Sequence, residues 1–156
     1  MACPFFMPIE KLENGTWPHP ARLPLGCGWS GHCTAPGHEG DRLQLEELHS
    51  CNLGYADSCR RMPQDRVWDA VRFAMRASTL RTSNGLEFLG RIELQYVCER
   101  KHRPGEYGTL EFDSVGLKWL RSHADPRVQK MAECFLQVHL ERRGARTSES
   151  VLPGAV

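Results

Sequence analysis

Five cysteines in the first sixty residues are the side chains most able to do chemistry in this 156-residue chain. The stretch LPLGCGWSGHCTAPGHEG, residues 23 to 40, places two of them with two histidines among five glycines and two prolines. Such a glycine- and proline-rich stretch is not expected to form a helix or a strand of its own. We therefore predict that an inorganic centre orders this part of the chain.

The spacing of these cysteines bears on the kind of centre. Successive members of the set are separated by 23, 5, 17 and 7 residues, so none forms the C-x2-4-C pair from which most structural zinc sites are built. Iron–sulfur clusters are larger than one ion and are held mainly by four thiolates, which distant segments can supply. The pattern favours a 4Fe-4S cluster, and zinc is the alternative because it also accepts widely spaced ligands.

Four ligands must be chosen from five cysteines. The predicted ligands are Cys3, Cys33, Cys51 and Cys59. The last three surround a predicted short helix, and the first would hold a terminus that otherwise frays. Cys27 is an alternative to Cys33. In a zinc site, His38 and His49 are further candidates, because each lies within five residues of a cysteine and imidazole nitrogen binds zinc well.

The alternative is that the cysteines are buried, unligated thiols with a packing role. We accept this interpretation for Cys98 and Cys134, which lie in predicted core positions. No apolar run is long enough to span a bilayer and no secretory signal begins the chain, so we expect a cytoplasmic protein without a membrane partner. Disulfides are rare in that reducing compartment, and seven cysteines cannot all pair.

Two helices are predicted. One covers residues 42–50, with Asp41 as its N-cap and Gln44 at the capping-box position, and ends directly before Cys51. The other runs from Pro126 to residue 143 behind the N-cap Asp125, with an apolar stripe along one face.

Strands are predicted between these helices. Apolar residues alternate with polar ones over 71–76 and 92–98, and Asn84-Gly85 is a strong signal for a hairpin turn between them. Residues 109–115 form a possible third strand. A helix over 65–77 is the competing interpretation, because Trp68, Val71 and Met75 also match helical spacing.

The predicted fold class is therefore α+β, with a loop-rich cysteine lobe stapled by a metal centre, an antiparallel hairpin or three-stranded sheet, and a C-terminal helix. Residues 1–143 are expected to form one domain, in which 1–64 are the metal-binding lobe and 65–143 the hairpin and helix. Residues 144–156 are expected to be a flexible tail.

The charge distribution argues against a general attraction to nucleic acid. The net charge is +1; residues 1–65 carry five Lys or Arg against eight Asp or Glu, and the remainder carry fifteen against eleven. The leading hypothesis is an iron–sulfur or metal-binding protein with a structural, electron-transfer or sensing role and an unidentified redox or protein partner.

Two other functions remain open. In one, zinc supports an interaction module that binds a protein or nucleic-acid partner through basic residues such as Arg72, Arg76 and Arg91 beside Trp68. In the other, the chain is a small thiol- or histidine-dependent enzyme that uses Cys27 or His102.

Overall fold

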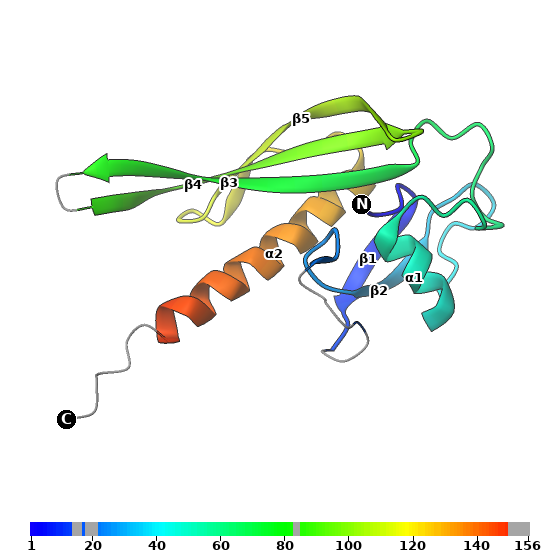
Figure 1. Ribbon diagram of the computed structural model, residues 1–156, viewed down its shortest axis with the longest axis horizontal. Coiled ribbons are helices and arrows are strands. Elements are labelled where there is room, and N and C mark those ends of the chain that lie inside the picture. Colours follow the sequence, from blue (N-terminus) through cyan, green and yellow to red (C-terminus); the bar gives the residue numbers. More distant parts are fainter. Residues whose placement is uncertain (14–16, 18–21, 83–84, 150–156) are drawn as a thin grey trace.

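The computed structural model describes residues 1–13, 17, 22–82 and 85–149 and has an α+β architecture with antiparallel sheets and a C-terminal helix, as predicted (Figure 1). In chain order its elements are β1 (Phe6–Lys11), β2 (Trp29–Cys33), α1 (Leu45–Leu53), β3 (Ala70–Thr82), β4 (Gly85–Arg100), β5 (Arg103–Asp113), β6 (Lys118–Arg121) and α2 (Pro126–Glu149). Neither helix is long and apolar enough to cross a bilayer.

The larger sheet is four-stranded, in the order β3-β4-β5-β6. Its long hairpin pairs β3 with β4 from Ala70 opposite Glu99 to Thr82 opposite Gly85, so the competing helix over 65–77 is wrong. The period-two alternation of β3 prevails because its inward residues meet an equally apolar row on β4. Asn84, the first residue of the predicted turn pair, lies outside the described residues, while β6 is a fourth strand that the prediction lacked.

Helix α2 lies across this sheet (Figure 1). Asp125 caps it as predicted, because its Oδ1 accepts the backbone N–H of Arg127 at 2.8 Å. One apolar core joins the two layers and contains Ile92, Leu94, Leu110, Phe112, Ala132 and Leu136. The helix continues to Glu149, so residues 144–149 are helical rather than part of a tail. Ala145, Arg146 and Glu149 favour helix, and a helix that is already nucleated can extend through the weaker helix formers between them.

The cysteine-rich lobe contains a two-stranded antiparallel sheet, β1-β2, in which Phe6 lies opposite Cys33. The expectation that residues 23–40 form no strand is therefore wrong. Trp29, Gly31 and Cys33 are buried and alternate with half-buried neighbours, as a strand with one covered face requires. The lobe also has apolar core residues of its own, including Phe6, Leu25, Trp29 and Leu48, so cysteines are not its sole source of order.

Helix α1 starts three residues later than predicted. Its N-cap is Gln44 rather than Asp41, and Gln44 and Glu47 form the capping box. Arg42 is occupied in a β-bridge with His32, which keeps the chain extended at that point. Cys51 consequently lies in the last turn of the helix rather than after it.

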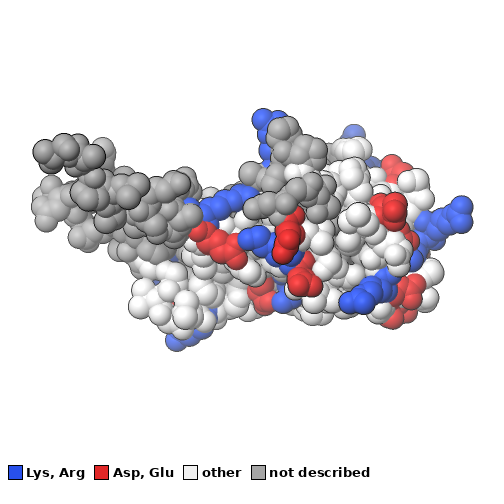
Figure 2. Space-filling model, turned by 90° about the horizontal axis from the view of Figure 1, so that it is seen from below, with Lys and Arg blue, Asp and Glu red and all other residues white. Residues whose placement is uncertain are grey.

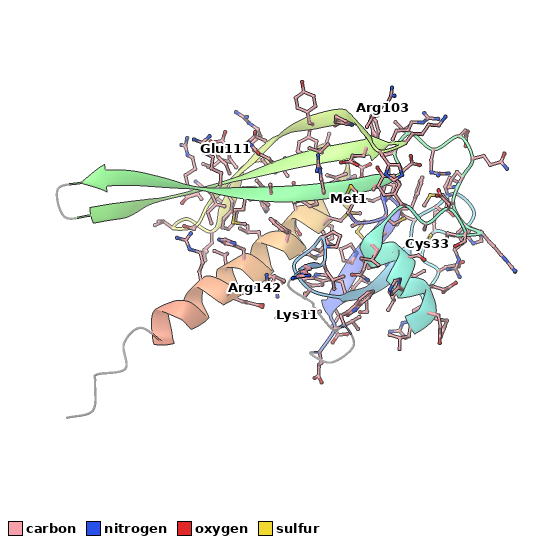
Figure 3. The ribbon with its side chains drawn as sticks, in the orientation of Figure 1. Met1, Lys11, Cys33, Arg103, Glu111 and Arg142 are labelled. Atoms are coloured by element: carbon pink, nitrogen blue, oxygen red, sulfur yellow. The ribbon has the colours of Figure 1, made fainter. Side chains whose placement is uncertain are left out.

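The lobe is joined to the rest of the molecule at both ends. Ala2 exchanges two backbone hydrogen bonds with Val71 of β3, with N···O distances of 2.6 and 2.8 Å. Near the far end of β1, Lys11 forms an ion pair with Glu141 of α2 at 2.5 Å, and Arg142 donates to the carbonyl of Gly26 (Figure 3). On the face shown in Figure 2, described acidic and basic side chains are interspersed rather than separated.

Candidate metal centre

Four cysteines from separate segments line one cavity of about 440 Å³. They are the four predicted ligands, Cys3, Cys33, Cys51 and Cys59. The first precedes β1, the second ends β2, the third lies in α1, and the fourth lies in the loop between α1 and β3. The structure therefore brings together side chains that are up to 56 positions apart in the chain.

Backbone hydrogen bonds place these cysteines. The N–H of Cys3 donates to the carbonyl of Cys51 at 2.8 Å, and the N–H of Cys33 donates to the carbonyl of Asp41 at 2.9 Å. Figure 3 shows Cys33 beside α1. Hydrogen bonds between the segment before β1, the small sheet and α1 thus form the walls of the cavity.

Asn52 holds α1 against β2 from within the core, where it is 1% exposed. Its Nδ2 donates to the carbonyls of Trp29 and Leu48 at 3.0 and 2.9 Å, and its Oδ1 accepts the N–H of Trp29 at 3.0 Å. Because a buried amide costs free energy unless it is bonded, this nearly complete set fixes the orientation of the helix. No motif or spacing in the sequence singles out Asn52.

Burial controls the ionisation of the thiols. It raises the pKa of Cys3 to about 12, and it raises the pKa values of Cys33 and Cys51 as well. Neighbouring thiols add to each shift, and Cys59 raises the pKa of all three. At neutral pH these buried groups are therefore neutral thiols unless a cation compensates their charge.

Backbone N–H groups nevertheless act on two of the thiols in the direction that favours ionisation. The N–H of Ala35 donates to Sγ of Cys33 at 3.4 Å, and the backbone N–H groups of Phe5 and Phe6 act on the thiol of Cys3 in the direction that favours its thiolate. Backbone N–H···S contacts are a recognised means of stabilising and tuning thiolate-bound centres.

Two guanidinium groups add positive charge at this place. Arg61 lines the cavity and interacts electrostatically with Cys33, while Arg127 does so with Cys3 and stacks over the ring of Phe5, 5.3 Å from its centroid. Arg61 is held by Glu47 at 2.6 Å and by Asp41 at 3.6 Å. Its position two residues after Cys59 is the sequence signal that points to it.

The alternative ligands are placed differently. Cys27 does not line the cavity; its thiol interacts instead with Lys11, Glu141 and Arg142. His38 does line the cavity, but its Nδ1 lies 3.0 Å from Oδ2 of Asp41. His49 stacks on the indole of Trp17, with ring centroids 4.9 Å apart.

Among the described residues, no three His, Cys, Asp or Glu side chains are arranged so that they could hold a metal ion. The four sulfurs border a space rather than converge on a point. Metal binding by the lobe thus remains a prediction, although the four cysteines predicted as ligands line the same cavity.

The surroundings of Cys27 and His102 do not favour catalysis by a thiol or a histidine. Burial raises the pKa of Cys27 to about 11, which opposes a nucleophilic thiolate. His102 is exposed at a turn and stacks on Tyr55 at 4.1 Å.

Two of the three arginines named for the interaction module are ion-paired. Arg72 pairs with Glu99 at 3.0 Å and Arg91 with Glu111 at 3.7 Å, and the ring of Trp68 lies against Gly105.

No family model, no curated protein and no solved structure matches this chain. The function is therefore inferred from the geometry of the cavity.

Proposed function

We propose that the chain is an iron–sulfur protein that binds a 4Fe-4S cluster through Cys3, Cys33, Cys51 and Cys59. The observation that carries this proposal is the convergence of four cysteines, from four segments, on one cavity. Neutral thiols packed in a core need no such arrangement, whereas four thiolates around one cation-rich object do.

The size of the space favours a cluster over a single zinc ion. Zinc requires each of four sulfurs to lie about 2.3 Å from one point. The cysteines here line a cavity of about 440 Å³, and within the described part of the chain no three His, Cys, Asp or Glu side chains surround one ion position. A four-iron cluster spreads its thiolate ligands farther apart, because each sulfur binds a different iron.

The chemistry of the walls agrees with this choice. Phe5, Leu43 and Met62 supply apolar surface, which limits the access of water to a cluster. Backbone N–H groups favour the thiolates, while the guanidinium groups of Arg61 and Arg127 are themselves paired with carboxylates. The centre would join the terminus, β2, α1 and the following loop, which is a structural role, and its half-exposed fourth cysteine also suits electron transfer or sensing.

Anaerobic purification and metal analysis test the proposal. We expect a brown protein with about four iron and four sulfide ions per chain. Cys33→Ala and Cys51→Ala should lose most of this iron. The matched controls Cys98→Ala and Cys134→Ala should keep it, because both cysteines are buried outside the cavity.

Two results would contradict the cluster. Zinc without sulfide would indicate the zinc-stapled module instead. Retention of iron by Cys33→Ala and Cys51→Ala together would show that the metal lies elsewhere.

A further inference from the structure

The four cysteines of the cavity are not equivalent in exposure. Cys3, Cys33 and Cys51 are buried, with 6%, 7% and 8% of their surfaces exposed. Cys59 is half-buried, and both of its chain neighbours, Ser58 and Arg60, are exposed. The cavity therefore reaches solvent on the side of Cys59.

The cysteines also differ in how firmly the fold holds them. Cys3 follows the residue paired with β3 and donates its own N–H to α1, and Cys33 and Cys51 belong to a strand and a helix. Among the described residues, the backbone of Cys59 bonds within its own loop, donating to Ala56 at 2.9 Å and accepting from Met62 at 3.1 Å. Moving Cys59 would disturb one local turn, whereas moving any of the other three would disturb contacts between elements.

A backbone hydrogen bond also reaches the sulfur of one of the anchored cysteines. The N–H of Ala35 donates to Sγ of Cys33 at 3.4 Å. Three anchored ligands and one on a solvent-facing turn make a site at which one iron can change its ligand while the rest of the cluster stays in place.

We propose that Cys59 is the exchangeable ligand of the centre and that a small external thiol can replace it at iron. This inference rests on the proposed function. In the exchange, the iron–sulfur bond to Cys59 breaks and the Cys59 thiolate takes the proton of the incoming thiol, whose own thiolate bonds to the same iron. No electron is transferred, and the other three bonds persist. The position thus gives a small molecule direct access to one iron of the cluster.

Reconstitution of three variants tests this inference. Wild type, Cys59→Ala and Cys33→Ala would be loaded anaerobically with iron and sulfide in the presence of 2-mercaptoethanol. We expect Cys59→Ala to retain at least about half of the wild-type iron and sulfide, and Cys33→Ala to retain less than about a tenth. Native mass spectrometry should find one 2-mercaptoethanol per cluster in Cys59→Ala and none in Cys98→Ala.

A measurement on the wild-type protein covers the case in which a variant fails to fold. Brief alkylation of the loaded protein by iodoacetamide, followed by peptide mapping, should label Cys59 at least about tenfold faster than Cys3, Cys33 or Cys51 while the cluster absorbance remains.

The outcomes separate this inference from the proposed function. A wild-type protein without iron and sulfide overturns both. A loaded wild-type protein in which the four cysteines are alkylated at one common rate overturns only the exchangeable ligand. The same conclusion follows if Cys59→Ala folds, by circular dichroism, but loses its cluster as completely as Cys33→Ala.

Discussion

Asp69 shows how a single buried carboxylate positions the chain between the cysteine lobe and the sheet. Its side chain is 8% exposed and accepts hydrogen bonds from Arg66 Nε at 2.5 Å and from the backbone N–H of Lys101 at 2.6 Å. Burial acts to raise the pKa of Asp69, but the N–H of Lys101 and the guanidinium of Arg66 outweigh it, so the pKa is lowered. The ionised form therefore stabilises the fold.

Replacing Asp69 by Asn should lower the free energy of unfolding by about 3 kcal/mol at pH 7, because Arg66 and the N–H of Lys101 lose a charged partner in a buried place. A carboxyl group whose pKa is lowered by folding contributes stability above its unfolded pKa, near 3.9, and loses it as pH falls through the folded value. Denaturant unfolding from pH 7 to pH 2.5 should thus show the two proteins converging below about pH 4.

The exposed Asp65 provides the matched control. Asp65→Asn should change stability by less than about 0.5 kcal/mol. A difference between wild type and Asp69→Asn that stays constant over the whole pH range would contradict the assignment of the effect to the carboxylate charge.

At the scale of elements, the small sheet β1-β2 carries Cys33 to the cavity. Gly31 is a position at which the two strands and the core lie too close for a side chain. A Cβ at Gly31 would lie 2.2 Å from the backbone oxygen of Met7 and 2.7 Å from the ring of Phe6. Neither a strand backbone nor a fully buried ring can move away cheaply.

Gly31→Ala should therefore separate β1 from β2, lower stability by about 2 kcal/mol or more and reduce cluster content with it. Ser30→Ala on the same strand removes only a 3.2 Å bond from the hydroxyl to the carbonyl of Glu10 and should cost less than about 1 kcal/mol. Thermal unfolding and iron analysis of both variants give the comparison. Equal effects in the two would show that the close approach at Gly31 is unimportant.

Elements with a long periodic pattern of apolar residues could be predicted from the sequence, whereas elements that depend on tertiary contacts could not. The hairpin β3-β4 and helix α2 carry long periodic patterns, so their types could be predicted. Strand β2 could not, because Gly31 is selected by a close tertiary approach that sequence spacing does not reveal. Asn52 and Asp69 escaped notice for a related reason, since a polar side chain reads as exposed until its buried partners are known. The four cysteines were chosen from their relation to a helix whose boundaries were displaced by three residues, which left the choice unaffected.

At the scale of the whole molecule, the fold contains two cores of different character. The core between the large sheet and α2 contains Ile92, Leu94, Leu110, Phe112, Ala132 and Leu136, and no cysteine is among these residues. The second core includes six cysteines and spans the lobe, the start of β3 and the inner side of α2. Any stabilisation by metal should therefore be concentrated in the second core.

Removal of the centre should open the molecule unevenly. After anaerobic loading and then chelation, amide hydrogen exchange should accelerate by at least about tenfold in residues 28–62 and by far less in residues 92–112 and 128–138. Cys33→Ala, prepared without metal, should show the same uneven pattern. Uniform acceleration along the chain would instead mean that the two cores unfold as one unit.

The pairing of Ala2 with Val71 has a consequence for the order of events during synthesis. Cys3 is synthesised before the strand edge that holds its neighbour Ala2, because Val71 follows almost seventy residues later in the chain. Until then a nascent chain offers at most three of the four sulfurs in their final places. Assembly of an inorganic centre would accordingly wait until β3 has been synthesised. Until then the Cys3 thiol of the growing chain would be neither buried nor bound to metal.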